Sequence, residues 1–546
     1  MSSRKSFDYI IIGAGSAGCV LANRLSADSS NRVLLVEAGG RHRNPLIDIP
    51  GAYIKLFRTA VDWQYWTEPQ ANVNDRKMYL PRGKVLGGSS ATNAMAYVRG
   101  HKNDFDGWSR LGNEGWSYNQ VLPYFKKSEH NEQIRDLDVA YHGEGGELNV
   151  TQNQFYRTPY SEAFITAGQQ VGLPYNGDYN GIRQEGIGKF QFTIKDGSRH
   201  SGYSAFIKPV LGRENLHIAT GKTVTRVLFE GKRAVGVETI GGGVLEADCE
   251  VILSAGAFNS PKILILSGVG AYSELRKHKI PEVLELASVG KNLQDHLLFP
   301  VSAVAKSRAG LNQHVSMWGQ LRAIWPYLTR KQGPFTIGPL EAVAFFNVDD
   351  YAKDANFQFH FAPMHIGSDY NYDLYDISSF PHEEDGYTIL PSLLHPGSRG
   401  HVQLRSKDPK DAPRINPNFL SDPQDLHQLV KGGEIAWEIM QQEAMKIHLD
   451  RMVMPSKKPS FTEWEDHIRR TVETIYHPVG TCRMGTDEHS VVDPELKVHG
   501  LDNLRVVDAS IMPNIVTGNT NAAVYMIAEK AADMILGNDP LPAEHL

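Results

Sequence analysis

The chain has 546 residues, of which 41% are hydrophobic and 22% are charged, and its formal net charge is −6 at pH 7. Since this length exceeds what one hydrophobic core usually supports, we expect two globular domains. The small negative charge, without a long basic run, argues against a nucleic-acid partner and favours a small, weakly charged substrate.

The cysteine pattern and the hydropathy of the sequence indicate the cellular compartment of the protein. Cys19, Cys249 and Cys482 are far apart and odd in number, which supports neither a disulfide framework nor a zinc site and favours a reducing compartment. The apolar run after Arg4 and Lys5 is short and leads into a glycine-rich turn, so we interpret it as a strand rather than a secretory signal. The sequence contains no run of about 18 or more apolar residues, so it does not predict a membrane span. We expect a cytoplasmic protein and leave peripheral association with the inner membrane open.

The first predicted elements surround the sequence GAGSAG at residues 13–18, with a strand-like run at 7–12 before it and an apolar-periodic stretch at 19–25 after it. The glycines permit a tight turn and let bare backbone approach a pyrophosphate, whose charge is met by the amides and dipole of the following helix. A second β-run at 33–36 ends at Glu37, whose carboxylate can accept both ribose hydroxyls of an adenine dinucleotide. This order predicts a dinucleotide site, and a nicotinamide enzyme sharing the same motif stays an alternative.

Three later segments also place small residues beside a strand or helix. A Gly/Ser-rich loop spans 82–93, the run at 251–253 ends in a small-residue turn, and the run at 504–507 leads to Asp508 and then to a helix at 522–535. An acid at the carboxyl end of a strand is where an open α/β sheet meets its ligand. The alternatives are a flexible surface loop in the first case and an acid that caps a turn in the last.

The middle of the chain lacks glycine fingerprints but contains strictly alternating segments at 357–361 and 401–405, which predict half-buried antiparallel strands. We therefore expect an α/β protein with a Rossmann-like, discontinuous nucleotide domain and an inserted α+β substrate domain built on an antiparallel sheet. The expected ranges are 1–150, 210–298 and 471–546 for the nucleotide domain, and 151–209 and 299–470 for the substrate domain.

The stretch containing Trp318, Leu321, Trp325 and Leu328 predicts a helix with an aromatic face, and basic residues lie nearby. Because Pro326 interrupts the stripe, we expect the helix to pack over the substrate domain or at a dimer contact. Contact with a membrane or another partner stays the alternative.

One histidine, His477, lies in a Gly/Pro-punctuated loop at 476–485 ahead of the strand that leads to Asp508. Loops on a rigid scaffold concentrate catalytic groups, and an imidazole suits proton removal from an alcohol near neutral pH. A histidine that serves backbone hydrogen bonds is the alternative. We interpret Cys482 as a buried structural residue, since no nearby base follows from the sequence. The remaining histidine pairs lack the spacing of a helical ligand motif, so we assign no metal site.

Together these motifs resemble the glucose-methanol-choline (GMC) oxidoreductases, a family of FAD-dependent alcohol dehydrogenases and oxidases, over nearly the whole chain. The resemblance depends on six separated motifs in order: the turn at 13–18 with Glu37, the loop at 83–100, the segments at 256–270 and 290–296, the His477 loop, and the segment at 508–521.

The resemblance implies a bound FAD and a flavin-facing base. FAD would be held by Gly13, Gly15, Ser16, Gly18, Glu37, Gly87, Gly88, Asn93, Val224, Asp508, Ala509, Asn519 and Thr520. His477 would act as base or hydrogen-bond partner of the substrate hydroxyl, and Asn521 would supply the second polar contact while hydride passes to flavin N5. Thr92 stands where some choline oxidases carry a histidine linked to FAD, so noncovalent FAD is expected.

Asn521 also indicates the branch, because aryl-alcohol and glucose oxidases carry a second histidine where choline, sorbose and hydroxymethylfurfural-type members do not. The resemblance implies a choline dehydrogenase-like or sorbose dehydrogenase-like enzyme, a monomer or homodimer, that oxidises an alcohol to an aldehyde or ketone and passes electrons to a quinone-like acceptor or O2. Hydroxynitrile lyase and fatty-acid photodecarboxylase activities are the family's non-redox or photochemical alternatives. Choline and uncharged primary alcohols or polyols all stay open as substrates, since no cage for a quaternary ammonium is recognisable.

Overall fold

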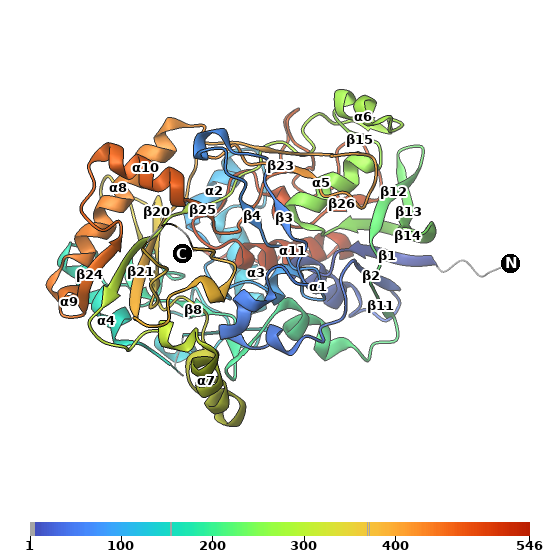
Figure 1. Cartoon of the computed structure of the whole chain (residues 1–546). Helices are drawn as coiled ribbons and strands as arrows, with labels where there is room; N and C mark the ends of the chain where they lie inside the picture. The colour runs from blue at the N-terminus through green and yellow to red at the C-terminus, as the bar shows by residue number, and fades with distance from the viewer. Residues whose placement is uncertain (1–5, 153–155, 369, 371) are drawn as a thin grey trace.

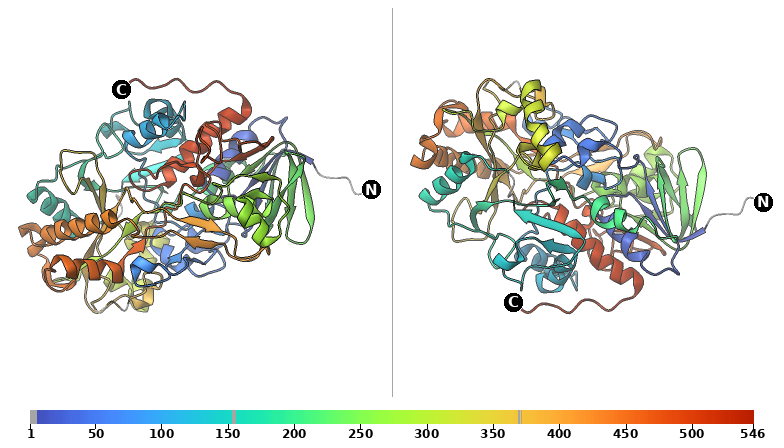
Figure 2. Two further views of the ribbon diagram at one scale, coloured as in Figure 1. Left: turned by 90° about the horizontal axis from the view of Figure 1, so that it is seen from above. Right: turned by 90° about the horizontal axis from the view of Figure 1, so that it is seen from below.

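The computed structural model describes residues 6–152, 156–368, 370 and 372–546. Two large sheets lie at opposite ends of the molecule (Figure 1 and Figure 2), and the first combines strands from both ends of the chain with strands from residues 216–253. Helices cover both sheets, so the mixed α/β architecture is confirmed.

The first sheet has seven strands in the order β11-β2-β1-β14-β13-β12, with β26 beside β14. Its strands are β1 (Ser6–Ile12), β2 (Val33–Glu37), β11 (Leu216–Thr220), β12 (Val224–Glu230), β13 (Arg233–Thr239), β14 (Gly243–Leu253) and β26 (Leu504–Val506). β11, β2, β1, β14 and β26 pair in parallel, whereas β12 and β13 add an antiparallel hairpin onto β14. The carboxyl ends of the parallel strands therefore share one edge, where ligands of open α/β sheets bind.

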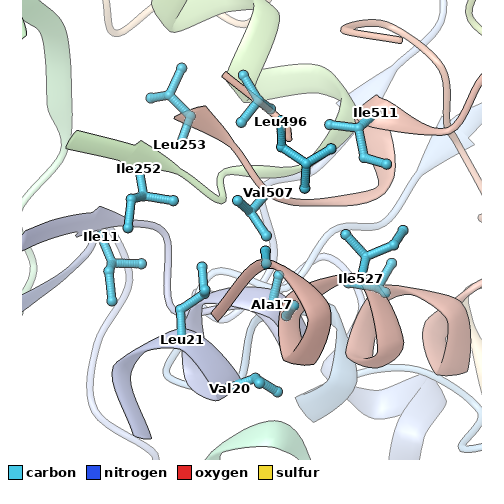
Figure 3. Close-up of a cluster of buried hydrophobic side chains, with 14 of the residues drawn as sticks. Ile11, Ala17, Val20, Leu21, Ile252, Leu253, Leu496, Val507, Ile511 and Ile527 are labelled. Atoms are coloured by element: carbon cyan, nitrogen blue, oxygen red, sulfur yellow. The ribbon is translucent and has the colours of Figure 1, made fainter. Parts of the chain in front are cut away.

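Helices α1 (Ser16–Leu25) and α11 (Asn521–Leu536) pack together beneath this sheet, although about 500 residues of chain separate them. Their apolar side chains meet those of the strands in one buried core, drawn in Figure 3 with Leu21 of α1, Ile527 of α11 and Ile252 of β14. All three side chains are fully buried. α3 (Tyr118–Ser128) packs on the other side of α11.

The second sheet has eight strands and is antiparallel, in the order β24-β18-β21-β20-β19-β7, with β17 beside β21 and β25 beside β17. Its strands are β7 (Gly186–Lys189), β17 (Leu297–Leu298), β18 (Val301–Ala305), β19 (Ala342–Phe346), β20 (Phe357–Ala362), β21 (Gly386–Leu393), β24 (Leu449–Met454) and β25 (Glu473–Thr474). Helices α4 (Pro159–Gln170), α8 (Pro423–Met440) and α10 (Phe461–Thr471) pack around it. β17 and β25 fall just inside the ranges expected for the nucleotide domain, and the exact domain limits stay a prediction.

Strand β20 corrects one expectation, because it is buried on both faces rather than on one. Phe357, Phe359 and Phe361 belong to the core under α4 and α8. The polar residues between them are buried too, since His360 lines the cavity described below and Gln358 lies beside the same site. The apolar/polar alternation of the sequence therefore predicted the two faces of β20 correctly, but it did not predict that the polar face is covered by other parts of the protein.

The remaining elements connect these layers. They are α2 (Lys102–Arg110), α5 (Gly256–Leu266), α6 (Tyr272–His278), α7 (Met317–Arg330), α9 (Glu443–Lys446), β3 (Tyr65–Trp66), β4 (Tyr79–Leu80), β5 (Glu129–Asn131), β6 (Leu148–Gln152), β8 (Gln191–Phe192), β9 (Ile194–Lys195), β10 (Ser198–Arg199), β15 (Val269–Gly270), β16 (Leu284–Glu285), β22 (His401–Gln403) and β23 (Arg414–Asn416). The second alternating segment is thus the strand of a separate two-stranded sheet. Within the described residues, no helix is long and apolar enough to cross a membrane.

Candidate active site

A cavity of about 360 Å³ lies between the two sheets. Its wall takes Gly13, Glu37 and Ser254 from the carboxyl-end loops of the first sheet and His360 and Leu390 from strands of the second. One continuous space therefore joins the predicted nucleotide turn to the predicted catalytic loop.

The turn at 13–18 is shaped by contacts that exclude side chains. Gly13 has φ of +99°, and a Cβ there would lie 2.5 Å from the carbonyl oxygen of Ser254. A Cβ on Gly18 would lie 1.9 Å from the carbonyl oxygen of Gly13, so Gly18 closes the turn onto α1 and does not line the cavity. A Cβ on Gly15 would meet no protein atom within 4 Å, because Gly15 faces the cavity. The N-terminus of α1, with the small residue Ser16 in its first turn, thus faces open space that suits an anion.

Glu37 ends β2 and is buried at the cavity wall. Its carboxylate accepts hydrogen bonds from the backbone amides of Ala14 at 2.9 Å and Gly39 at 2.7 Å, so its position is fixed. Burial raises the pKa of this carboxyl to about 7, while the two amides oppose the shift. A carboxylate held in this way retains acceptor capacity for hydroxyl groups.

The Gly/Ser-rich loop folds over the nucleotide turn. The amide of Gly87 donates to the carbonyl of Ala14 at 2.8 Å, and a Cβ on Gly88 would lie 2.5 Å from the Cα of Gly15. Gly88 and Asn93 line the cavity, whereas Gly87 lies behind it. Arg199 donates to the side-chain oxygen of Asn93 at 2.8 Å and so orients it.

Asp508 follows β26 and is buried at the cavity wall. It accepts from the amide of Gly256 at 2.8 Å, the hydroxyl of Ser260 at 2.6 Å and the amide of Ser510 at 2.8 Å. It therefore ties the turn after β14 to the C-terminal segment. The remaining predicted cofactor residues that line the cavity are Val224, Ala509, Asn519 and Thr520.

His477 is buried at the far end of the cavity, and its ring nitrogens have different partners. His296 Nε2 lies 2.9 Å from the carbonyl oxygen of Leu394, which only accepts, so this nitrogen carries the His296 proton. His296 Nδ1 then has a lone pair and lies 3.0 Å from His477 Nδ1, which must donate to it. We assign the tautomer from these partners: His477 holds its proton on Nδ1 and presents a lone pair at Nε2.

The side chain that contacts this lone pair is Asn519, whose Nδ2 lies 3.1 Å from His477 Nε2. Gln358 Nε2 lies 3.5 Å from the Asn519 oxygen and sets the orientation of the amide. Asn521, the partner expected from the sequence, accepts instead from the Ser16 hydroxyl at 2.6 Å. The expectation is corrected because Asn521 is the first residue of α11, where the chain has already turned toward α1.

The segment at 290–296 holds the histidine loop in place. Gln294 forms a β-bridge with Val479, and the Asp295 carboxylate accepts from the His477 amide at 2.8 Å. Burial lowers the pKa of His477 well below the usual range and that of His296 to about 3, so both rings are neutral near pH 7. Burial also raises the pKa of Asp295 to about 6. The sequence had marked this segment without assigning His296 a role, because its partner lies 181 positions later in the chain.

The cavity wall near His477 is largely apolar. It includes Ile54, Phe57, Met364, Leu390 and Tyr476. The two acids among the described lining residues, Glu37 and Asp508, are both held by backbone amides. The wall therefore offers apolar and aromatic surface to a substrate, and neither lining acid is free to pair with a cation.

Two other candidates do not form part of the site. Cys482 is buried, and burial raises the pKa of its thiol, so it is not poised as a nucleophile. His101, Glu185 and Asp354 bring potential ligand atoms within 4.8 Å of one another. However, His101 Nδ1 accepts from the amide of Asn103, so Nε2 carries the proton and points to the carboxylates as a donor.

A nucleotide-type turn joined by one cavity to a buried imidazole is the arrangement of a cofactor-dependent enzyme. A family model described as GMC oxidoreductase matches residues 7–298, and a second with the same description matches residues 396–528. The chain belongs to the GMC oxidoreductase family and is an oxidoreductase.

Similar proteins extend the match over nearly the full length. An alcohol dehydrogenase [acceptor] of Pseudomonas putida is 44% identical and covers 97% of this chain and 96% of its own. An oxygen-dependent choline dehydrogenase of Rhizobium etli is 40% identical over 98% of this chain and 96% of its own. A solved formate oxidase from Aspergillus oryzae, studied for FAD modification, superposes with a TM-score of 0.90 at 28% identity, over 98% of this chain and 99% of that one.

Proposed function

We propose that this protein binds FAD and oxidises an uncharged alcohol with an apolar body to an aldehyde or ketone. The observation that carries the proposal is the lone pair of His477 Nε2, which Asn519 contacts, at the end of the cavity that begins at Glu37. Family membership and the relatives named as dehydrogenases and oxidases support net oxidation over lyase or photochemical activity.

The residues of the cavity fit FAD. Gly15 and the N-terminus of α1 would receive the pyrophosphate, and Glu37 would accept the ribose hydroxyls. Val224 would contact the adenine, Asp508 and Ala509 would lie along the ribityl chain, and Gly88, Asn93, Asn519 and Thr520 would approach the flavin. When bound, FAD supplies the hydride acceptor. Since Thr92 lines the cavity where a covalent histidine is expected in some choline oxidases, we propose noncovalent binding.

His477 would accept the substrate hydroxyl proton at Nε2, since its other nitrogen is committed to His296. The Asn519 amide lies beside His477 Nε2 and would donate to the substrate hydroxyl oxygen. This is the role first expected of Asn521. Burial keeps the His477 imidazole neutral before the reaction, whereas Asn519 is half-buried at the cavity wall. These positions orient the alcohol against a flat acceptor.

The test is anaerobic mixing of the purified yellow protein with a panel of 1-alkanols, aryl alcohols, sugars and choline. We expect apolar primary alcohols to bleach the flavin fastest and choline to bleach it slowly, because the wall offers no free carboxylate. A flavin that no alcohol bleaches contradicts the activity, and preferential bleaching by choline contradicts the substrate class. Reoxidation by O2 or by a soluble quinone then identifies the electron acceptor.

The base is tested with His477→Ala. The variant should retain FAD and lose about 10² to 10⁴-fold in the rate of flavin reduction, the usual scale for a positioned acid-base group. Unchanged reduction with full FAD content would remove His477 from the mechanism. Release of FAD by acid precipitation of the native protein checks noncovalent binding separately.

A further inference from the structure

Helix α7 (Met317–Arg330) exposes a row of large apolar side chains. Trp318 and Trp325 are each 70% exposed, Leu321 is 53% exposed and Leu328 is 64% exposed. Their spacing of three or four residues places them on one face of the helix. Figure 1 shows α7 projecting from the body of the molecule (olive), and these side chains are largely exposed to solvent.

The exposed face belongs to a well-anchored helix. Gly319, Ala323 and Tyr327 are buried on the opposite side, and the Ser316 hydroxyl caps the first turn by accepting from the amide of Gly319 at 3.1 Å. The Tyr327 hydroxyl donates to the carbonyl of Asp48 at 3.3 Å. The helix continues through Pro326. Its orientation is therefore fixed by the body of the protein.

The sequence that surrounds α7 carries positive charge. No acid occurs between Asp295 and Glu341, whereas this span contains Lys306, Arg308, Arg322, Arg330 and Lys331 in a chain of net charge −6. All five cations are exposed. Within the described residues, Arg322, Arg330 and Lys331 take part in no ion pair, so their charges are available to an external anion.

We propose that α7 docks the protein onto an anionic membrane surface. Tryptophan, leucine and arginine on one rigid helix are the composition of interfacial helices, with apolar side chains inserted below the headgroups and cations among the phosphates. Unpaired cations on α7, in a sequence span from 296 to 340 that contains no acid, favour lipid phosphate over a protein partner of mixed charge. The proposal does not depend on the substrate or on the redox reaction.

Docking would bring the cavity close to the bilayer. Val315, two residues before α7, belongs to the apolar cluster that contains the cavity-wall residues Ile54, Met364 and Ile366. Lys55, in the same short helix as Ile54, hydrogen-bonds Gln320 of α7. The wall of the active-site cavity and the docking helix are thus parts of one packed unit.

The experiment is co-sedimentation of the FAD-loaded protein with vesicles of phosphatidylcholine alone or with phosphatidylglycerol. We expect binding to the anionic vesicles that weakens with added salt, and a loss of about tenfold or more in Trp318→Ser/Trp325→Ser. Ile182→Ser/Ile447→Ser is the matched control, because these side chains are 78% and 71% exposed elsewhere. Flavin absorbance and thermal unfolding confirm that both variants are folded.

Two results would overturn the proposal. One is vesicle binding that is absent, or that the α7 double variant leaves unchanged. The other is a stable dimer, seen by sedimentation velocity without lipid, that the α7 variant dissociates, because the face would then be covered by a second copy. Arg322→Glu/Arg330→Glu should weaken anionic binding selectively, and equal binding to neutral vesicles would contradict the role of charge.

Discussion

Two buried imidazoles facing each other through Nδ1 atoms are a demanding arrangement, because only one proton fits between them. The carbonyl of Leu394 accepts the only N–H of His296, so the proton between the two rings belongs to His477. His296 is therefore a positioning residue that acts through His477 and keeps the lone pair of His477 at Nε2.

His296→Leu removes the acceptor for His477 Nδ1–H and leaves that group buried without a partner. We expect flavin reduction to slow about 10-fold to 100-fold with FAD content retained. His296→Gln should restore most of the rate, because its amide can accept from His477 and donate to Leu394. Stopped-flow reduction distinguishes this from a packing effect, in which the two variants would be equally slow.

Asn519 and Asn521 provide a matched comparison, since both are asparagines at or just before the start of α11. Asn519→Ala should slow flavin reduction about 10-fold or more, because it removes the donor to His477 Nε2. Asn521→Ala should affect FAD retention or thermal stability instead, since its contact is with Ser16. Equal losses of the reduction rate in both variants would contradict the assignment.

Glu37 makes FAD affinity depend on pH. Its pKa is raised to about 7 in the free protein, and ribose hydroxyls prefer the carboxylate, so binding must release a proton at lower pH. The dissociation constant of FAD should therefore rise as pH falls from about 8 to 6, approaching tenfold per unit below the pKa. In Glu37→Gln, measured by flavin fluorescence, affinity should be weaker and the pH dependence flat.

For single residues, the sequence predicted His477 as the base and a set of FAD-binding residues because each lies in a short motif. It did not predict that His477 pairs with Asn519, since the direction of a side chain changes within two residues as loop becomes helix. Gln358 and His296 were not predicted as site residues either, because their roles arise from strand pairings between distant segments.

At the scale of elements, the turn between β1 and α1 contains one glycine that the fold requires and another that ligand binding requires. Gly18→Ala places a Cβ against the Gly13 carbonyl and should destabilise the protein by about 1 to 3 kcal/mol, even without FAD. Gly15→Ala fits a backbone with φ of −76° and meets no protein atom, so the apoprotein should unfold normally while FAD binding is lost. Thermal unfolding with and without FAD distinguishes the two outcomes.

Element prediction succeeded where local chemistry decides and failed where tertiary context does. The strand, turn and helix at the N-terminus follow from glycine and apolar spacing. Strand β20 was expected to be half-buried, but the second face is covered by the cavity region rather than by water. The helix at α7 continues through Pro326 because anchored side chains on both sides of the proline hold its geometry.

The whole molecule is a pair of sheets with a ligand cavity between them, so bound FAD contacts segments from both. A ligand that binds only the folded state stabilises it by about 2.7 kcal/mol at 100 times its dissociation constant. We expect the apparent melting temperature of the apoprotein to rise with added FAD, in one transition that includes both sheets. Calorimetry showing that only one of two transitions shifts would contradict a cavity shared by both parts.

The pairing of α1 with α11 has a consequence for how the protein is made. Arg24 hydrogen-bonds Asp533 at 2.7 Å, and Asn521 meets Ser16 across almost the entire chain. A ribosome that has released the nucleotide turn must still translate about 500 residues before the helix that covers it exists. We therefore expect FAD to bind after translation is complete, and until then the emerging N-terminal core would present an apolar surface of the kind that chaperones recognise.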